Sequence, residues 1–544
     1  MILQFEFKYT STNRVLENLL VSICKDFNIE FKLSRASKYV ILLLVRDEIE
    51  RLEKFSNYLS DRLPLSIFFK STTAKVVDSF EVEEIEVKDV DIVLPFTPKV
   101  FNSNRLFINN EVGKKIYSDD VKVIFQGKSV ENFDEMLKNI KEFFISNGQM
   151  TISSASGEFT YGILNESFKE KNIEYFEILP TDLSVIQKMV VAKENEITTL
   201  ATLEKPIIEF RLNTLYKEKG MLNSNRVKIK LADEILIFKI FQELFNDGVE
   251  FIYRFKANEK VDLKIEGILN TISKVEVVVL ENDEILIVKG DSYSGIDFQS
   301  VLKKFETPSY GQFASVLQEH DLFDKKVSCF YLSKIHSDLL MHLSEKTGML
   351  KLVEFPVMRD FRAIFDEIEK SDTGKRLVKN YKKTFPELYD NILNTKISKS
   401  LPDSIYSIWG IVAVILGIST SVEEGSRKIV ELSDDFGGLK GPRIDYKLIE
   451  ETSIYNKFDM IKLIRSSMSF KLAGTDDKTL SFGLIEALSY FLSDMSDFCR
   501  NNLSAQNLVL CGSMFSIKKF CEISCKNLQP NIKIHFNREL PIEN

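Results

Sequence analysis

The sequence predicts a multidomain α/β protein, on the evidence of its length, its composition and its alternating hydrophobic patterns. A chain of 544 residues exceeds what one hydrophobic core usually holds, so we expect several domains. With 44% hydrophobic and 28% charged residues, its composition is that of ordinary globular proteins. Segments with alternating apolar residues recur between segments with apolar residues at helical spacing. This mixture is typical of α/β domains, in which helices cover sheets.

The first 75 residues carry the clearest pattern. Apolar side chains alternate or run together in four short segments, and they follow helical spacing in two longer ones. The predicted strands are 3–7, 29–33, 39–45 and 65–69, and the predicted helices are 15–23 and 49–59. We expect Ser11 or Thr12 to cap the first helix. The order βαββαβ predicts a ferredoxin-like unit.

The remaining chain divides into three stretches. Residues 76–130 are acidic and irregular, which predicts a connecting region, and 131–265 mix predicted helices and strands. From 266 to 544, strand-like segments alternate with long helices, as in an α/β domain with covered sheets. The longest apolar run, Ile405–Thr420, is too short for a comfortable membrane span, so we predict a buried core helix there.

Charge and residue counts exclude several classes of function. A net charge of −8 without long basic runs disfavours nucleic acid as the main ligand. The N-terminus lacks the pattern of a secretion signal, so we expect a cytoplasmic protein without a membrane span. The six cysteines form no CxxC pair, which predicts unpaired thiols rather than a zinc or iron–sulfur site. Four histidines are too few for a histidine-rich metal centre.

One local pattern near the C-terminus has a phosphate-binding logic. A predicted strand at 507–510 leads into the small-residue turn Cys511-Gly512-Ser513 and then into a predicted helix at 514–527. The N–H groups at a helix N-terminus attract phosphate. The alternative is an ordinary strand–turn–helix connection. Cys521 and Cys525 share a face of this helix, where we expect buried thiols rather than metal ligands.

A second small-residue segment comprises Gly437 and Gly438, followed by Gly441 and Pro442. Glycines let a ligand approach the backbone, but they also commonly end helices. The segment follows a predicted helix that contains residues 427–432, so both interpretations fit. Neither small-residue segment identifies a function by itself.

Several segments, taken in order, resemble the HypF-type carbamoyltransferases, which make the cyanide-ligand precursor of nickel–iron hydrogenases. Residues 404–418, SIYSIWGIVAVILGI, resemble the family's SAGRLFDAVAALLGI, and 421–432 resemble its YEGQAAMELE. Residues 508–517 and 535–541 resemble its LSGGVFQN and HRQVPPNDGG segments. Residues 1–70 are similar to its acylphosphatase domain, and 179–183 with 197–212 to the end of its YrdC-like domain.

This resemblance implies a division of the chain and a set of site residues. It implies an acylphosphatase-like domain at 1–75, a connecting region without zinc fingers at 76–130, a YrdC-like domain at 131–265 and a Kae1-like domain of the actin/Hsp70 ATPase class at 266–544. ATP is the implied cofactor, and no zinc is expected. Its implied binding residues are Glu424, Gly425 and Gly512, and the two small-residue segments add Gly437, Gly438 and Ser513 as candidates. Arg14 falls where the acylphosphatase loop has its arginine, as a candidate anion contact; the alternative is an exposed arginine at a helix start.

The departures from the family concern its catalytic motifs. The glycine-rich acylphosphatase loop reads YTSTNR here, and the family's metal-binding HHHAH run is absent, which leaves only His336 and His342. Ser407 and Gly410 replace the Arg and Asp of GRLFD, and Ser513 replaces the second glycine of the phosphate turn. Such losses remove sources of transition-state charge stabilisation. They predict a HypF-like scaffold without most of the family's catalytic groups.

Three functions remain open on this evidence. The first is an accessory protein of nickel–iron hydrogenase maturation, with maturation proteins or the hydrogenase large subunit as partners. The second is an active carbamoyltransferase that uses carbamoyl phosphate and ATP. The third is a nucleotide-binding regulator unrelated to hydrogenase. Fold resemblance alone does not choose between them, because one fold supports many activities.

Overall fold

The computed structural model describes residues 1–12, 14–85, 121–129, 133–154, 156–171, 173–256, 260–267, 275–290, 304–449 and 455–542. The chain forms two compact units. Unit 1 comprises Met1–Val279 with Lys289–Ile296, and unit 2 comprises Leu280–Val288 with Asp297–Asn544. Strand β16 (Ile285–Gly290) lies where the chain passes between them. The fold is mixed α/β with several sheets, as predicted. In the described part of the chain, no helix is long and apolar enough to cross a membrane.

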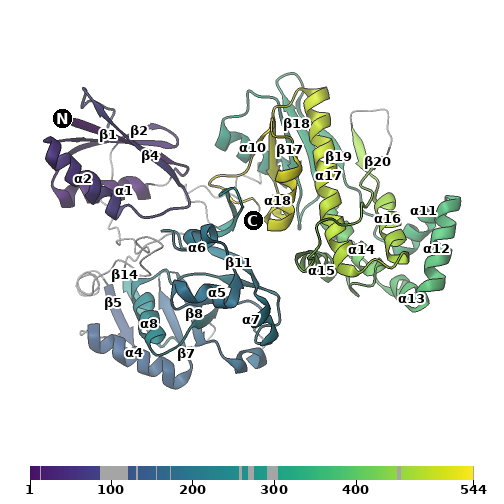
Figure 1. Ribbon diagram of the computed structural model, residues 1–544, viewed down its shortest axis with the longest axis horizontal. Helices are drawn as coiled ribbons and strands as arrows, with labels where there is room; N and C mark the ends of the chain where they lie inside the picture. Colours follow the sequence, from purple (N-terminus) through teal and green to yellow (C-terminus); the bar gives the residue numbers. More distant parts are fainter. Residues whose placement is uncertain are drawn as a thin grey trace. The chain divides into compact units, whose positions relative to one another are not determined.

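The N-terminal part of unit 1 has the predicted order βαββαβ. Its elements are β1 (Ile2–Tyr9), α1 (Val15–Phe27), β2 (Glu30–Ser37), β3 (Val40–Arg46), α2 (Ile49–Arg62) and β4 (Phe69–Val77). The strand order is β2-β3-β1-β4, and both helices lie on the same face of this sheet (Figure 1). The alternation in β1 explains the packing, since Phe5 and Phe7 are buried and Phe5 contacts Phe55 of α2.

Two local predictions in this part are wrong. The last strand begins at Phe69 rather than Leu65, because the backbone N–H of Ile67 donates to the carboxylate of Glu204 instead of joining a sheet. Neither Ser11 nor Thr12 caps α1, because the helix begins only after Arg14. The carbonyl of Ser11 instead accepts a hydrogen bond from the guanidinium of Arg35, which fixes the loop before the helix.

A second sheet fills the rest of unit 1, in the order β15-β11-β12-β9-β13-β8-β7-β14-β5-β6, with β10 paired to β11. Its strands are β5 (Val121–Phe125), β6 (Lys128–Ser129), β7 (Gln149–Ser154), β8 (Gly157–Ile163), β9 (Glu177–Pro180), β10 (Val190–Val191), β11 (Ile207–Leu212), β12 (Arg226–Ile229), β13 (Phe251–Lys256), β14 (Leu263–Gly267) and β15 (Val275–Val279). This sheet therefore includes strands on both sides of the predicted range 131–265.

Two helices, α4 (Phe133–Asn147) and α8 (Ile235–Asn246), pack on one face of this sheet (Figure 1). Their apolar stripes, which include Ile140 and Leu244, join sheet residues such as Ile152 and Ile252 in a common core. Shorter helices complete the unit: η1 (Glu166–Lys171), η2 (Leu183–Val185), α5 (Ile186–Met189), α6 (Glu194–Leu200) and α7 (Thr214–Glu218).

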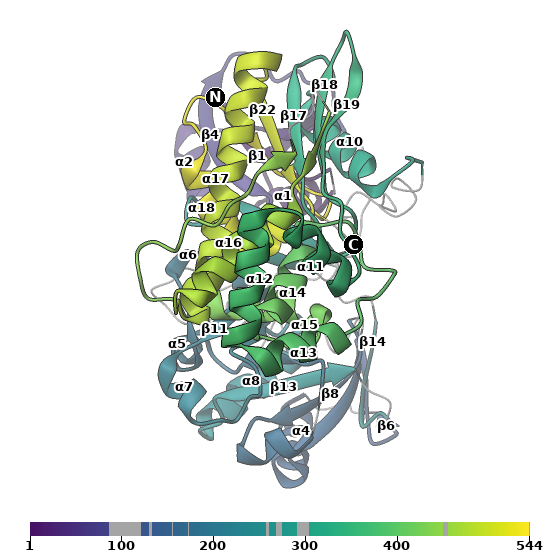
Figure 2. The same ribbon diagram turned by 90° about the vertical axis from the view of Figure 1, so that its right-hand side faces the viewer.

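Unit 2 is built on a seven-stranded sheet with the order β20-β21-β19-β18-β17-β22-β23. Its strands are β17 (Val327–Tyr331), β18 (Leu339–Ser344), β19 (Gly348–Glu354), β20 (Leu448–Ile449), β21 (Asn456–Phe458), β22 (Asn507–Cys511) and β23 (Lys533–His535). Helices α10 (Pro308–His320) and α17 (Asp477–Leu503) lie on opposite faces of this sheet (Figures 1 and 2). Helix α18 (Lys518–Asn527) packs beside α17.

A group of helices continues unit 2 beyond one end of the sheet (Figure 2). It comprises α11 (Phe361–Glu369), α12 (Asp372–Thr384), α13 (Pro386–Asn394), α14 (Ile405–Ile415), α15 (Val422–Asp434) and α16 (Met460–Leu472). Helix α14 coincides with the long apolar run and is buried from Ser407 to Ile415, which confirms the predicted core helix. The indole N–H of its buried Trp409 donates to the hydroxyl of Tyr446 (2.7 Å).

The predicted helix at 514–527 is wrong in its first turn. Residues Ser513–Ser516 form a 3-10 turn, η3, and α18 begins only at Lys518. The reason is local hydrogen bonding: the N–H of Met514 donates to the carbonyl of Leu332, and that of Phe515 donates to the carbonyl of Gly512. An α-helix N-terminus therefore does not follow directly on the Gly512 turn.

Candidate functional site

Three segments of unit 2 meet in what we term the loop cluster: residues 332–338 between β17 and β18, 401–405 before α14, and 511–517 between β22 and α18. Strands β17 and β22 pair in parallel, with Tyr331 opposite Cys511, so their carboxyl ends open at the same edge of the sheet. The N–H of Leu332 donates to the carbonyl of Cys511 (3.0 Å). Ligands commonly bind at the carboxyl ends of parallel strands.

Gly512 is required by its surroundings. Its φ of +96° is one that other residues rarely adopt, and an added Cβ atom would lie under 3.0 Å from the carbonyl of Leu332. The close neighbour of this glycine is therefore protein backbone. This packing accounts for Gly512 without a ligand, so its role in binding a nucleotide stays a prediction.

Lys334 lies beside the predicted phosphate turn. Its backbone N–H donates to the hydroxyl of Ser513 (2.9 Å), and its ammonium donates to the hydroxyl of Ser516 (2.8 Å). The structure thus brings a cation to the turn that contains Ser513. The sequence alone did not reveal Lys334, because it precedes Ser513 by 179 residues and only the pairing of β17 with β22 joins them.

Asp338 fixes the first segment of the loop cluster against the second. Its buried carboxylate accepts hydrogen bonds from the N–H of Ser333 (2.6 Å) and of Ile405 (2.6 Å). Its own N–H donates to the carbonyl of Asp403 (2.9 Å). Such charge-assisted bonds are about twice as strong as neutral ones. Asp338 therefore holds the β17–β18 turn at the start of α14.

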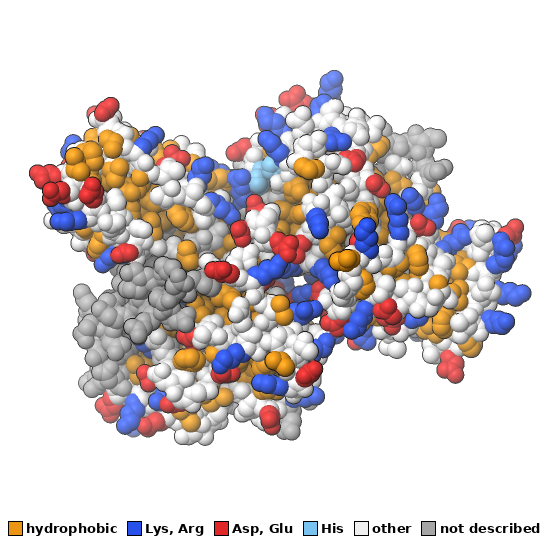
Figure 3. Space-filling view, viewed as in Figure 1, with side chains coloured by type: hydrophobic (Ala, Val, Ile, Leu, Met, Phe, Trp, Pro, Cys, Tyr) orange, Lys and Arg blue, Asp and Glu red, His pale blue; other side chains and the backbone are white. Residues whose placement is uncertain are grey.

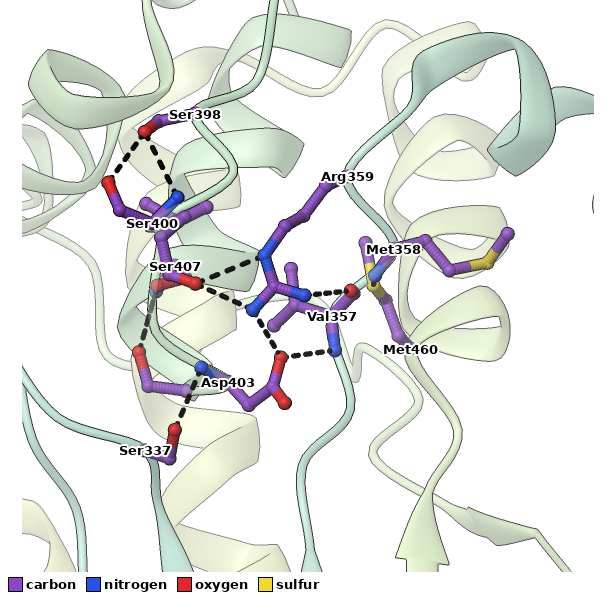
Figure 4. Close-up of polar contacts among 11 residues, drawn as sticks. Ser337, Val357, Met358, Arg359, Ser398, Ser400, Asp403, Ser407 and Met460 are labelled. Carbon is purple, nitrogen blue, oxygen red and sulfur yellow. Dashed lines mark hydrogen bonds and ion pairs between the residues drawn. The ribbon is translucent and has the colours of Figure 1, made fainter.

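Arg359 holds the second segment from the other side (Figure 4). Its guanidinium donates to the carboxylate of Asp403 (2.7 Å), to the carbonyl of Leu401 (2.6 Å) and to the carbonyl of Val357 (3.0 Å). Asp403 also accepts from the N–H of Val357 (3.1 Å). The start of α14 is therefore fixed before its cap, Ser404, whose hydroxyl accepts from Ser407 N–H (3.2 Å).

Gly425 contacts α14 rather than the loop cluster. An added Cβ atom at Gly425 would lie 2.8 Å from the Cβ of Ala413 and 2.9 Å from the carbonyl oxygen of Gly410. An added Cβ atom at Gly410 would lie under 3.0 Å from the carbonyl of Val422. The neighbouring Glu424 is partly exposed and pairs with Lys428 (3.1 Å). The two glycines therefore let α14 and α15 approach closely.

Gly437 and Gly438 lie in the segment after α15. Gly437 faces open space, whereas an added Cβ atom at Gly438 would meet the ring of Phe436. That ring stacks on Phe482 of α17, with 4.5 Å between the ring centroids. Lys519 of α18 lies over the same Phe482 ring (4.9 Å) and donates to the carbonyl of Ser433. Helix α18 thus links the segment that contains Gly437 and Gly438 to the loop cluster. A role of these two glycines in binding a ligand stays a prediction.

Arg14 meets a carboxylate of its own chain. The nearer guanidinium nitrogen of Arg14 lies 3.9 Å from Oε1 of Glu17, which is fully buried. Arg35 donates to the same oxygen through Nε (2.9 Å) and Nη2 (2.5 Å), and to the carbonyls of Ser11 and Lys38. An internal anion therefore faces both arginines. Binding of an external anion at Arg14 stays a prediction.

A buried cluster of charges in unit 1 was missed by the sequence analysis. Arg254 of β13 donates to the carboxylate of Glu177 opposite it on β9 (2.6 Å), and it lies 4.0 Å from Asp233. Lys230 pairs with Asp233 (3.2 Å) and donates to the carbonyl of Lys205 (2.7 Å). Burial lowers the pKa of Lys205 to about 7 and also lowers that of Lys230.

No local signal points to these charges, because they come from four separate segments that only the sheet brings together. A small cavity adjoins the cluster and is lined by Thr181, Lys205, Leu231 and Ala232 among others. Its volume of about 30 Å³ suits one or two water molecules rather than a nucleotide. The cluster therefore has the character of a buried structural network.

The thiols are unpaired, as predicted: all six cysteines are free. Cys329 and Cys511 approach each other in the paired strands β17 and β22 (Sγ–Sγ 3.5 Å). Cys521 and Cys525 lie in α18, where Cys521 is buried. In the part of the chain that the structure describes, no group of three or more His, Cys, Asp or Glu side chains is arranged to hold a metal ion.

Comparisons with known proteins agree with this architecture. No protein-family model matches the chain. The chain is 24% identical to Protein HydE of Wolinella succinogenes over 565 aligned positions, which cover the whole of both chains. A crystal structure of T. kodakarensis HypF matches with a TM-score of 0.65 and 11% identity, covering 100% of this chain and 96% of that chain. The chain is HypF-like in fold and HydE-like in sequence.

A second structure, full-length HypF in a phosphate- and nucleotide-bound form, matches this HypF-like chain with a TM-score of 0.59 and 12% identity. It again covers 100% of this chain and 96% of the other. The resemblance to HypF that the sequence predicted is thus confirmed over the full length. At such low identity the likeness concerns the fold, and the finer division into acylphosphatase-like, YrdC-like and Kae1-like domains stays a prediction.

Proposed function

We propose that this HypF-like protein is an accessory protein in the maturation or assembly of nickel–iron hydrogenase. The observation that carries the proposal is the end-to-end similarity to HydE combined with a HypF fold over the whole chain. Its partners in this role are hydrogenase maturation proteins or the hydrogenase large subunit, in the cytoplasm. The acylphosphatase-like, YrdC-like and Kae1-like parts act as a retained scaffold.

Within this scaffold, the loop cluster is our candidate site for the phosphates of ATP. Lys334 supplies a cation beside the hydroxyls of Ser513 and Ser516, at the carboxyl ends of two parallel strands. A lysine next to a small-residue turn suits a phosphate group electrostatically. Asp338 and Arg359 keep the surrounding turns in place, which reduces the cost of ordering them on binding.

The packing of α14 supports a loss of the transferase reaction. The resemblance assigns a carboxylate to position 410, and this position is a glycine in close contact with α15. A side chain there would require the two helices to separate. The close packing of α14 and α15 therefore supports the proposal that the chain lacks the carboxylate of the transferase.

A deletion strain tests the role in maturation. We expect the hydrogenase large subunit to remain unprocessed and hydrogenase activity to be lost, and expression of the wild-type chain to restore both. The matched control is a second deletion that removes an unrelated reading frame of similar length. Normal processing and activity in the deletion strain would contradict the proposal.

Purified protein separates the three candidate functions. The accessory role predicts ATP binding without release of AMP and pyrophosphate when carbamoyl phosphate is added. Release of AMP and pyrophosphate that depends on carbamoyl phosphate would establish the transferase instead. ATP binding together with an unaffected hydrogenase in the deletion strain would favour a regulator unrelated to hydrogenase.

A further inference from the structure

A groove of about 810 Å³ lies in the helical part of unit 2, apart from the residues of the loop cluster. Its walls are helices α12 and α16, which lie side by side (Figure 2), and its end is formed by the segment 443–445. The volume is within the range of small-molecule sites. Figure 3 shows Lys and Arg side chains spread over the outer helices of this unit.

Each of the two helices presents one mostly polar stripe of side chains to the groove. On α12 the stripe is Thr373, Arg376, Leu377 and Asn380, and on α16 it is Lys462, Arg465, Ser466 and Ser469. Both follow the spacing i, i+3, i+4, i+7, which places their side chains on one face of each helix. A different face of each helix is buried, with Val378 and Tyr381 in α12 and Leu463 and Ile464 in α16. The helices therefore line the groove with hydroxyl, amide and cationic groups, together with the apolar side chains of Leu377 and Phe470.

The segment 443–445, which forms the end of the groove, is fixed by buried neighbours. Buried and exposed residues alternate along this segment: Ile444 and Tyr446 are buried, whereas Arg443 and Asp445 face the groove. The hydroxyl of Tyr446 donates to the carbonyl of Leu484 (2.9 Å), and the N–H of Asp445 donates to the hydroxyl of Ser466 (3.2 Å). These hydrogen bonds fix the backbone that follows Ile444, and with it the position of Arg443.

The charges of the groove are unbalanced. Four cationic side chains, Arg376, Arg443, Lys462 and Arg465, line it with the single carboxylate of Asp445, a formal charge of +3 in a chain whose net charge is −8. Lys462 pairs with Asp459 at 3.8 Å, and Arg465 donates to the hydroxyl of Thr373 (2.7 Å). Among the described residues, Arg376 and Arg443 have no ion-pair partner within 4.0 Å.

We propose that this groove binds the polyphosphate group of a small molecule. Guanidinium groups bind phosphate oxygens through paired, charge-assisted hydrogen bonds, and the hydroxyls of Thr373, Ser466 and Ser469 supply further donors. A groove with cations on both helices and on the segment at its end suits a compact polyanion. The proposal is independent of the proposed function, because it uses none of the residues of the loop cluster.

Binding of inorganic tripolyphosphate to the full-length protein, measured by calorimetry, tests the proposal. We expect Arg376→Gln/Arg443→Gln to lower the affinity by about tenfold or more, from the loss of two charge-assisted contacts. The matched control is Lys375→Gln/Lys471→Gln, which makes the same change of charge at two lysines of α12 and α16 that lie outside the groove. The control is expected to change the affinity by less than about twofold, since only screened long-range attraction is lost.

Two further arms locate the site and the source of the phosphate. Lys334→Gln weakens binding at the loop cluster, so tripolyphosphate binding that is unchanged in this variant and falls with the two groove substitutions supports the groove. Equal affinities for ATP and tripolyphosphate indicate a free polyphosphate chain, and tighter binding of ATP indicates a nucleotide. Equal binding by the groove and control variants would overturn the proposal. Binding of a deca-glutamate peptide without binding of tripolyphosphate would also overturn it, in favour of an acidic protein partner.

Discussion

Gly410 of α14 and Gly425 of α15 face each other where the two helices come closest. An added Cβ atom on Gly425 would lie 2.9 Å from the carbonyl oxygen of Gly410, and one on Gly410 would meet the carbonyl of Val422. The hydroxyl of Ser426 strengthens the same contact, because it donates to the carbonyl of Tyr406 (2.7 Å). Small residues at this crossing therefore let the two helices pack at close range.

Gly410→Asp is expected to destabilise unit 2 rather than restore a reaction. The side chain overpacks the α14–α15 contact and buries a carboxylate, so we expect a loss of at least about 2 kcal/mol in the free energy of unfolding. Urea unfolding followed by the fluorescence of Trp409, which is the single tryptophan and lies next to position 410, measures this.

The control for this substitution is Gly437→Ala, at a glycine with open space around the position of Cβ. We expect a change within about 0.5 kcal/mol for this surface substitution. Equal stability of Gly410→Asp and the wild type would show that α14 and α15 can separate freely, against the packing described.

Lys334→Gln is expected to weaken ATP binding at the loop cluster. Loss of a charge-assisted contact to phosphate commonly costs about 1.5–3 kcal/mol, so we expect the affinity to fall by roughly tenfold to a hundredfold. Titration of the full-length protein with ATP measures the change. Lys346→Gln is the matched control, since Lys346 is an exposed lysine on the β18–β19 turn, at the other end of β18 from the loop cluster. An unchanged affinity in Lys334→Gln would place the nucleotide elsewhere.

Arg254→Met is expected to destabilise the sheet of unit 1. Arg254 is the fully buried counter-charge of Glu177, so its removal leaves the largely buried Glu177 carboxylate without its guanidinium partner, whereas Asp233 keeps its pair with Lys230. Breaking such a pair costs about 3–5 kcal/mol. Hydrogen exchange of the β9 and β13 amides in the full-length protein measures the loss.

Arg226→Met provides the comparison for Arg254. The guanidinium of Arg226 also pairs with a carboxylate in the same sheet, that of Glu209 (3.1 Å), but this pair is partly exposed. Partly exposed pairs contribute about 0–1 kcal/mol, so the exchange rates should change little. Similar effects of the two substitutions would mean that burial of the Arg254 cluster has no energetic consequence.

Glu319 makes the stability of unit 2 depend on pH. Its carboxylate accepts from the N–H groups of Arg538, Glu539 and Leu540 (2.7–2.9 Å), yet burial raises its pKa from 4.5 to about 7. A raised pKa in the folded state contributes stability below pH 4.5 that is lost as the pH rises through 7. The shift corresponds to roughly 3 kcal/mol. Glu319→Gln is expected to remove this contribution from the stability profile, measured by urea unfolding at intervals between pH 4 and pH 8.

His535 changes stability in the opposite direction. Burial lowers its pKa from 6.5 to about 4, so its contribution is present above pH 6.5 and is lost as the pH falls through 4. In Glu319→Gln, stability should therefore rise between pH 4 and pH 6.5. The exposed Glu345→Gln on the β18–β19 turn serves as control and should leave the wild-type profile unchanged. A wild-type profile in Glu319→Gln would refute the assignment to Glu319.

The sequence by itself determined the features that depend on local periodicity. The alternation in β1 and the helical spacing in α1 and α2 predicted the order βαββαβ, and the apolar run predicted α14 as a buried helix. Several short segments, in a fixed order along the chain, predicted the HypF resemblance. These features could be predicted because neighbours two to four residues apart decide which face of an element is buried.

Only the tertiary structure decided which distant residues form a site. Lys334 reaches Ser513 because β17 pairs with β22, and Arg254 reaches Glu177 because β13 pairs with β9. The structure also showed that Gly410, Gly425 and Gly512 lie against backbone or small side chains of the chain itself. The sequence does not show whether a glycine is needed because a ligand comes close to it or because another segment of the chain does. That choice depends on contacts between segments far apart in the chain, which local patterns do not encode.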